Sequence, residues 1–447
     1  MRTHRREFVA VGLAVLLVVA AFVVPKLDLG IVTPLINADA ERFEAFAGAA
    51  PIFGWWNAHV GWGTVPAVFI GGAAVLWGSA VAARLSFRML LWVTWAVSAC
   101  WAFSLAMIDG WQRGFAGRLT AHHEYLRQVP TVDDIPYAVR TFASRIIDYQ
   151  PDSWMTHVSG HPPGALLTFV WLDRIGLGGG AWAGLFCLLI GASAAAAILI
   201  AVRALSGEEL ARAAAPFVAV APTAIWIAVS ADGYFAGVAA WGIACLALAV
   251  RSSAWFAVPA GLLLGWAIFL NYGLGLIGLP AVAVLICASS WRSAGKVLGV
   301  AAACALVVVG VFHAAGFWWF DGYHAVQERY WQGIALDRPF QYWGWANLAS
   351  TVCAIGLGSV AGVSRAFSLP AVRQRSGIHL LVLAALLAIL CADLSMLSKA
   401  ETERIWLGFM VWLTAAPALL PVASRRWWLA ANVVGALLLN HLILTNW

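Results

Sequence analysis

A polar stretch, residues 109–160, contains the side chains best suited to chemistry in an otherwise apolar chain. Asp109 opens it directly after an apolar run, and a His161-Pro162-Pro163 turn follows its end. A carboxylate at the end of a membrane-type helix is costly to desolvate, which makes it a candidate general base. Two prolines fix the backbone, so the preceding histidine is held in a defined direction. Simpler interpretations stay open: Asp109 as an ordinary helix-end residue and His161 as a helix cap.

Two shorter polar segments contain further candidates. Asp232 lies in a tight turn between apolar runs, where it could ligate a metal, accept a hydrogen bond from a substrate hydroxyl, or only form an Asp-Gly turn. Lys399, Glu401 and Arg404 directly precede another apolar run. Cationic groups at this depth suit a phosphate head group, although a salt-bridged loop would also explain them.

The aromatic segment 316–345 combines Trp and Tyr with acids. This composition suits anchoring at a membrane surface, and it also suits stacking on sugar rings. Asp321 and Tyr330 of this segment are therefore candidate substrate contacts, and so is His157 in the polar stretch 109–160. A small acidic cluster earlier in the chain is a rival source of the general base: Asp39, Glu41 and Glu44.

The elements that must position these residues are membrane spans. The chain has 447 residues, of which 62% are hydrophobic and 11% charged, and a soluble protein cannot bury so much apolar surface. Apolar runs long enough to cross a bilayer must be helical, because backbone polar groups cannot stay unpaired in lipid. We predict one all-α transmembrane domain, 1–447, with about thirteen spans: 8–24, 64–83, 89–108, 180–202, 213–230, 234–250, 254–271, 274–290, 296–315, 346–363, 378–395, 406–423 and 428–445.

The distribution of basic residues predicts the orientation of these spans. With a cytoplasmic N-terminus, the cytoplasmic segments contain 15 of the 27 Lys and Arg residues but only three acids. Segments 109–179 and 316–345 then become extracytoplasmic loops of a multi-pass plasma-membrane protein. The basic net charge of +6 therefore reflects topology and not an affinity for nucleic acid. All seven cysteines fall within predicted spans, so no disulfide or thiolate metal site is expected.

The loop 109–179 is predicted to contain surface helices. Residues 120–128 and 135–147 have amphipathic spacing typical of helices that lie on the membrane. Segment 164–175 is too short to span and is predicted to be a helix docked at the surface.

Together these residues resemble the pattern of the GT-C superfamily of membrane glycosyltransferases. That pattern is an Asp after an early span, a long loop ending in a Lys/His-Pro-Pro turn, and a second outer turn with an acid. Asp109, the His161-Pro162-Pro163 turn and Asp232 match it in order. The segment 398–407 resembles a Glu-x-x-Arg-Ile-Trp segment of actinobacterial mannosyl- and arabinosyltransferases. One departure is Gly110, which stands where some members have a second acid.

The resemblance implies an inverting transfer of a mannose- or arabinofuranose-type sugar. The donor would be a polyprenyl-phosphate sugar, and the acceptor a cell-envelope glycan or glycolipid at the outer face of the membrane. Asp109 would deprotonate the acceptor hydroxyl, while His161, Lys399 and Arg404 stabilise the departing phosphate. No cofactor is required for this step, although a divalent metal remains an alternative. A transporter or flippase of a lipid-linked precursor is the competing hypothesis, and an outer-face acyltransferase or polysaccharide ligase is a third.

Overall fold

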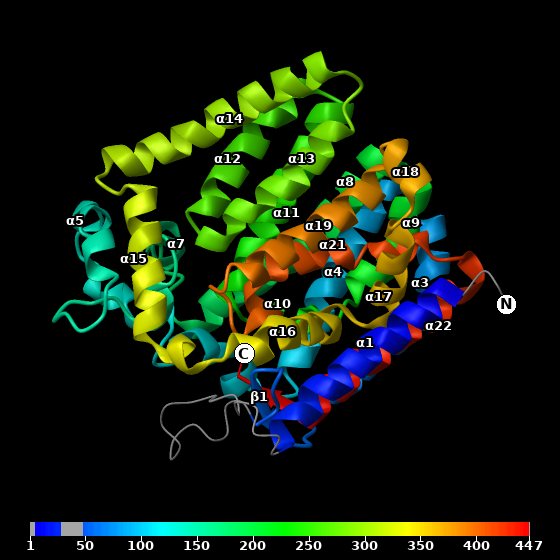
Figure 1. The fold of residues 1–447 in the computed structure, drawn as a ribbon, viewed down its shortest axis with the longest axis horizontal. Helices are drawn as coiled ribbons and strands as arrows, with labels where there is room; N and C mark the ends of the chain where they lie inside the picture. Colours follow the sequence, from blue (N-terminus) through cyan, green and yellow to red (C-terminus); the bar gives the residue numbers. More distant parts are fainter. Residues whose placement is uncertain (1–4, 28–47, 447) are drawn as a thin grey trace.

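The structure, a computed structural model, describes residues 5–27 and 48–446 and is almost wholly helical (Figure 1). The acidic cluster of Asp39, Glu41 and Glu44 lies outside the described residues. Within the described ranges, seven helices are long and apolar enough to cross a membrane. They are α1 (Arg5–Val23), α3 (Thr64–Arg84), α4 (Phe87–Ala106), α8 (Gly180–Ser206), α11 (Ala231–Arg251), α14 (Trp291–Ala314) and α19 (Gly377–Leu394). The chain is therefore a multi-pass membrane protein.

The predicted count of thirteen spans is not confirmed, because several of the other apolar runs form shorter or broken helices. An eighth span is counted only if α16 (Phe340–Ile355) and α17 (Leu357–Ala366), which meet at 106°, form one crossing. Gly356 makes this bend with a φ of +81°. Three runs give shorter apolar helical segments: Ala254–Ile268 (η8 and α12), Tyr272–Ile286 (η9 and α13) and Leu407–Leu419 (α21 and η11).

The remaining two predicted spans also differ from single uninterrupted apolar helices. The run 213–230 divides into α9 (Glu208–Ala219) and α10 (Ala224–Ile227). Pro222 lies in the break and removes a backbone donor there, whereas Pro216 is tolerated inside α9. The last run forms α22 (Val422–Leu442), a helix of full length whose first turns contain two arginines.

Helix α11 lies at the centre of the bundle, with most of its residues buried. Ser230 caps its N-terminus by accepting a hydrogen bond from the Gly233 amide at 3.0 Å, which places Asp232 in the first turn. Small residues let α8 approach α11 closely. A Cβ atom on Gly237 would lie only 2.3 Å from the Ile190 carbonyl oxygen, so no larger side chain fits there without movement.

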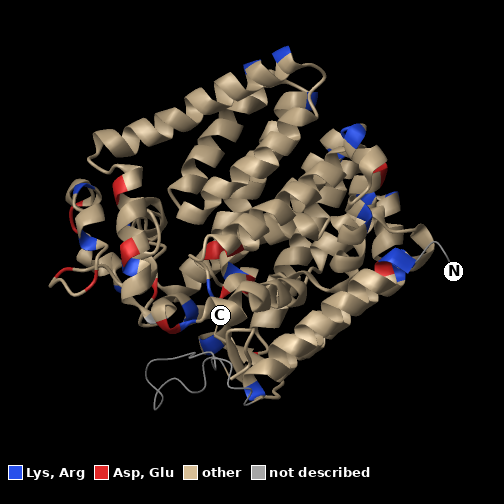
Figure 2. Cartoon of the chain, viewed as in Figure 1, with Lys and Arg blue, Asp and Glu red and all other residues tan. Residues whose placement is uncertain are grey.

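The charged residues divide between the two ends of the bundle. At one end Arg212 donates to the Ala82 and Leu85 carbonyls at 2.5 and 2.8 Å, which ties α9 to the turn between α3 and α4. Charges at this end are mostly Lys and Arg, whereas acids gather near α15 (Trp319–Gln332) and the loop 109–179 (Figure 2).

The loop 109–179 folds into short helical turns and one longer helix. The longer one is α7 (Pro163–Arg174), whose bounds agree with the helix predicted for 164–175. The predicted surface helices 120–128 and 135–147 are shorter than expected, because Phe142 and Ile146 are buried in a small core with Trp154 instead of lying along one membrane-facing stripe. The short turns are η3 (Gln112–Ala116), η4 (Arg118–Thr120), η5 (Tyr125–Arg127), η6 (Val129–Thr131), α5 (Ile135–Arg140), η7 (Ala143–Arg145) and α6 (Thr156–Ser159).

A two-stranded ribbon completes this polar end of the bundle. Strand β1 (Gly54–Trp56) pairs antiparallel with β2 (Ile443–Thr445), so the last described residues lie beside the segment that leads into α3. The remaining short elements are η2 (Val24–Lys26), η10 (Ile334–Asp337), α18 (Leu369–Arg373) and α20 (Thr402–Ile405).

Candidate functional site

Asp109 follows α4 and is held by an imidazole and two guanidinium groups. Its Oδ1 lies 2.9 Å from His59 Nε2, while Oδ2 lies 3.4 Å from Arg118 Nη2 and 3.6 Å from Arg113 Nε. The carboxyl side chain is only 9% exposed. Burial and the neighbouring Arg113 lower the pKa of Arg118 to about 10, so this guanidinium remains charged at neutral pH. Asp109 is thus a buried carboxylate surrounded by donors.

The β-ribbon positions the two arginines around Asp109. Arg113 Nη2 donates to the Thr445 carbonyl at 2.7 Å, and Arg118 Nη1 donates to the Asn446 carbonyl at 2.6 Å. Asp109 and Arg118 line a small cavity that Val229, from the turn before α11, also lines. Because Val229 is three residues before Asp232, this cavity connects Asp109 to the N-terminus of the central helix.

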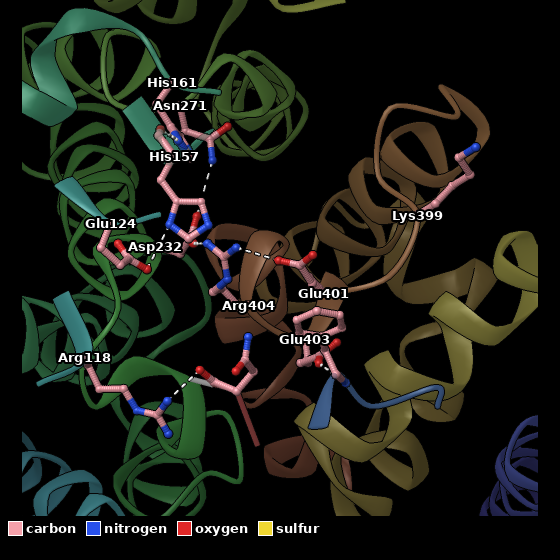
Figure 3. A network of polar contacts seen from close by, with 12 residues as sticks. Arg118, Glu124, His157, His161, Asp232, Asn271, Lys399, Glu401, Glu403 and Arg404 are labelled. Atoms are coloured by element: carbon pink, nitrogen blue, oxygen red, sulfur yellow. Dashed lines mark hydrogen bonds and ion pairs between the residues drawn. The ribbon is translucent and has the colours of Figure 1, made fainter. Parts of the chain in front are cut away.

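Asp232 belongs to a buried chain of ion pairs (Figure 3). Its Oδ2 accepts from Arg404 Nη1 at 2.5 Å, and Asn271 Nδ2 approaches Oδ1 at 3.4 Å. Arg404 Nη2 also donates to Glu401 at 2.9 Å, and Glu401 in turn accepts from Arg338 Nη2 at 3.1 Å. Four side chains from three segments therefore alternate in charge beneath the loop: Asp232, Arg404 with Glu401, and Arg338.

The charges in this chain reinforce one another. Burial alone would raise the pKa of Glu401, but Arg338 and Arg404 outweigh it and hold that pKa at about 2. Burial likewise opposes the charge on Arg404, yet the carboxylates of Asp232 and Glu401 raise its pKa above the ordinary value. Glu401 and Arg404 are both ionised at neutral pH, and together with Asp232 and Arg338 they form a buried array of charged side chains.

Glu124 and two histidines extend the array towards Asp109. Glu124 Oε1 lies 2.8 Å from His157 Nδ1, and the attraction of His157 overcomes burial and lowers the pKa of Glu124. His161 Nδ1 lies 2.8 Å from both the His157 carbonyl and the Tyr125 hydroxyl, while burial lowers the pKa of the ring. Glu124 also interacts electrostatically with both Arg118 and Arg404, so the surroundings of Asp109 and Asp232 adjoin.

The structure thus brings together most of the residues that the sequence predicts as a site. Asp232, Glu401 and Arg404 are bonded to one another, and His157 and His161 lie beside them (Figure 3). Tyr330 is at the edge of the cluster, where its hydroxyl accepts from the Lys399 amide at 3.0 Å and burial raises its pKa to about 12.

Two predicted contacts lie apart from the cluster. The Lys399 side chain points away from Arg404, and its Nζ lies 4.6 Å from the centre of the Trp331 ring (Figure 3). Only the Lys399 carbonyl touches the network, by accepting from Arg338 at 2.7 Å. Asp321 is exposed in the first turn of α15, nine residues before Tyr330 and therefore roughly 13 Å away along the helix.

Sequence reasoning missed several members of the array: His59, Arg118, Glu124, Asn271 and Arg338. Arg118 and Glu124 lie within the polar stretch, so their charge was a usable signal. Arg338 lies in the aromatic segment, whereas nothing in the local sequence marks His59 or Asn271. Within the described ranges, no group of three or more His, Cys, Asp or Glu residues is arranged to hold a metal ion.

Comparison with known proteins identifies the type of fold. No protein-family model matches the sequence, and no curated protein is significantly similar to it. The oligosaccharyltransferase of Archaeoglobus fulgidus in its apo form superposes with a TM-score of 0.54 at 10% identity, covering 80% of this chain and 56% of that protein. A second structure of that enzyme, with Zn and sulfate, matches with a TM-score of 0.48 at 13% identity over 79% of this chain and 53% of the other.

This chain therefore spans little more than half the length of the enzyme it matches. At 10% identity the likeness concerns the fold alone, which resembles that of this oligosaccharyltransferase. The more specific resemblance to actinobacterial mannosyl- and arabinosyltransferases is not confirmed.

Proposed function

We propose that the protein is a membrane glycosyltransferase that transfers a sugar from a polyprenyl-phosphate donor to a glycan or glycolipid acceptor. The observation that carries this proposal is the buried array of charges at the N-terminus of α11, which adjoins a carboxylate in a small cavity. An oligosaccharyltransferase has a similar fold, which supports a role of the array in sugar transfer. The bundle end that carries the array has the acidic loops, which supports an extracytoplasmic site with a cytoplasmic N-terminus.

In this proposal Asp109 acts as the general base. Its carboxylate takes the proton of the acceptor hydroxyl as the hydroxyl oxygen attacks the anomeric carbon of the donor. The bond between that carbon and the phosphate oxygen breaks on the opposite face, and its electron pair leaves with the phosphate. A phosphate leaving group needs little protonation, so one carboxylate suffices for an inverting transfer.

The departing phosphate requires cationic donors, and the array offers them. Arg404 and His161 were expected in this role, and both lie in the array. Arg118 is a further candidate because it lines the cavity with Asp109 and its Nε is buried with no hydrogen-bond partner among the described residues. A buried unsatisfied donor costs about 1–3 kcal/mol, and a phosphate oxygen that accepts from it would remove that cost. Such fixed donors stabilise charge that develops in the transition state.

The sugar we propose is of the mannose or arabinofuranose type. Support comes from the resemblance of segment 398–407, two residues of which, Glu401 and Arg404, are part of the array. We propose that the reaction needs no metal, since each carboxylate of the array and of the adjoining cavity already has an Arg or His partner. These carboxylates are Asp109, Glu124, Asp232 and Glu401. Retention of activity in EDTA is the expected result, and a loss that Mn²⁺ or Mg²⁺ restores would contradict it.

The proposal is tested with the purified chain in liposomes that contain a radiolabelled polyprenyl-phosphate mannose or arabinose and a glycan acceptor. Transfer of label with release of polyprenyl phosphate is expected, and it should be lost in Asp109→Asn. Movement of the labelled lipid across the bilayer without release of polyprenyl phosphate would instead support a flippase. If Asp109→Asn retains full transfer, Asp109 is not the base.

A further inference from the structure

His59 has a hydrogen-bonding arrangement that a neutral imidazole beside an ionised carboxylate cannot satisfy. Its Nδ1 lies 2.7 Å from the Asn57 carbonyl oxygen, and its Nε2 lies 2.9 Å from Asp109 Oδ1. A carbonyl oxygen only accepts, so Nδ1 must carry a proton. An ionised carboxylate also only accepts, so a second proton must lie between Nε2 and Oδ1. The pair of His59 and Asp109 therefore carries one proton more than a neutral ring beside a carboxylate.

A second histidine nearby shows what the ordinary arrangement looks like. His441 Nδ1 lies 2.7 Å from the Leu437 carbonyl, and its Nε2 lies 3.0 Å from the Thr64 hydroxyl. Because a hydroxyl can donate, the neutral ring of His441 satisfies both contacts with no additional proton. His59 and His441 differ in this respect although they share a hydrogen bond between the His59 amide and the His441 carbonyl at 2.9 Å.

Strand β1 and the residues after it hold His59 beside Asp109, and the ring of His59 remains partly accessible to water. The Asn57 amide donates to the Leu442 carbonyl at 2.9 Å, which holds the carbonyl partner of the ring in place. Among the described residues, the other charged groups paired with Asp109 are Arg113 and Arg118, both on its Oδ2 side. The side chain of His59 is 16% exposed and its sequence neighbours are exposed, so the ring can exchange a proton with water.

We propose that His59 is the residue that receives the proton which Asp109 takes from the acceptor hydroxyl. This inference rests on the proposed glycosyl transfer. In the active state the ring is neutral, with its proton on Nδ1, and Asp109 is ionised. As the acceptor oxygen bonds to the anomeric carbon and the phosphate departs with the bonding electrons, the hydroxyl proton passes to Asp109, and the same proton passes on from Oδ1 to His59 Nε2. The resulting imidazolium has an acceptor at each ring nitrogen, the Asn57 carbonyl and Asp109 Oδ1, and then releases the proton to water.

The consequence is a stronger base than a carboxylate alone, because imidazole binds protons more tightly than a carboxylate does. His59→Gln is the informative variant, since a glutamine amide can still donate to Asp109 but cannot accept its proton. We expect kcat to fall on the order of 10- to 100-fold while KM for the donor stays unchanged. The acidic limb of the pH–rate profile should move to lower pH, because activity then requires only an ionised carboxylate.

His441→Gln is the matched control, and it should retain the wild-type kcat and pH profile. If His59→Gln also retains both, or if kcat falls with an unshifted profile, His59 does not receive the proton. Should His59→Gln fail to fold, His59→Ala with added imidazole replaces it, and restored activity that rises with imidazole concentration is the expected result.

A measurement without substrate separates this inference from the proposed glycosyl transfer. Infrared difference spectra between acidic and neutral pH should show an imidazolium band that disappears in both His59→Gln and Asp109→Asn and persists in His441→Gln. If the band is present but no sugar is transferred, the shared proton stands and the proposed function fails. If transfer occurs but the band is absent, the proposed function stands and the shared proton of His59 and Asp109 is refuted.

Discussion

Two acids separated by one residue should respond in opposite ways to removal of their charge. Glu401 is bonded to Arg338 and Arg404, whereas Glu403 accepts from the Phe53 amide and the Ser350 hydroxyl, each at 2.8 Å, and has no ion pair among the described residues. Neither side chain is exposed to any large extent. The variants Glu401→Gln and Glu403→Gln remove one charge each and keep the shape of the side chain. They therefore compare a carboxylate with ion-pair partners and one without.

The expected effect of Glu401→Gln follows from its pKa. The pKa of Glu401 in the folded protein is about 2, against an ordinary value of 4.5. A tenfold difference in proton affinity corresponds to about 1.36 kcal/mol, so ionised Glu401 contributes on the order of 3 kcal/mol to folding. Since this pKa is lowered by folding, the contribution is complete above pH 4.5 and is lost as the pH falls towards 2. Glu401→Gln should thus cost about 3 kcal/mol at pH 7, and its difference from wild type should shrink below pH 4.5.

Glu403 provides the control of opposite sign. Burial raises the pKa of Glu403, and the hydrogen bonds from Phe53 and Ser350 only partly offset this. Folding therefore favours the protonated acid, and the penalty for its charge grows as the pH rises through the raised pKa. Glu403→Gln should leave the free energy of unfolding at pH 7 unchanged or increased.

The free energy of unfolding is measured by titration of the reconstituted protein with a denaturing detergent at several pH values, with tryptophan fluorescence as the signal. The reasoning would be refuted if Glu401→Gln cost less than about 1 kcal/mol at pH 7. A cost that did not change between pH 7 and pH 4 to 3 would refute it equally. Destabilisation of similar size in both variants would show that shape, and not charge, determines the result.

Three other predictions concern catalysis and packing. Asp109→Asn should lower glycosyl transfer on the order of 100-fold or more with normal expression and folding, as measured in liposomes. Arg404→Met should cost about 3–5 kcal/mol because it leaves Asp232 buried without its cation, and adding Asp232→Asn should recover part of that loss; additive costs in the double-mutant cycle would contradict the pairing. Gly237→Val should destabilise the protein by about 1–3 kcal/mol in the same detergent titration, since its Cβ would meet the Ile190 carbonyl, and a neutral result would show that α8 and α11 can separate.

The sequence predicts the long spans well because their physical cause is local. A run of about twenty apolar residues must form a helix in lipid whatever surrounds it, and α8 and α14 follow this rule. It fails between α9 and α10, where Pro222 interrupts an apolar run, and at Gly356, where a positive φ bends the chain between α16 and α17. The average composition of a segment does not reveal a single residue that breaks a helix. The predicted count of thirteen spans was therefore too simple a translation of apolar runs into helices.

The site is partly predictable for a different reason. Asp232 and Arg404 are 172 positions apart, yet both lie in turns at the same end of the bundle, so alternation of the spans was enough to bring them together. Partners such as Arg338 were not predictable, because its two contacts depend on how the segment after α15 packs against the turn before α20. Charge and sidedness limit which groups can meet, whereas tertiary packing determines which of them do.

The turn before α20 shows how packing determines the outcome at single residues. Ala400 and Glu401 both adopt positive φ, at 67° and 61°, a conformation that costs a non-glycine residue about 1–3 kcal/mol. These two residues reverse the chain direction, so Lys399 points to Trp331 while Arg404 points to Asp232. Hydrogen bonds offset the cost: the Ala400 amide donates to Asn347 at 3.2 Å, and the Lys399 carbonyl accepts from Arg338. The strained backbone of Ala400 and Glu401 is therefore part of the turn that directs the Glu401 and Arg404 side chains into the array. Relaxing this turn should weaken the site before it weakens the fold.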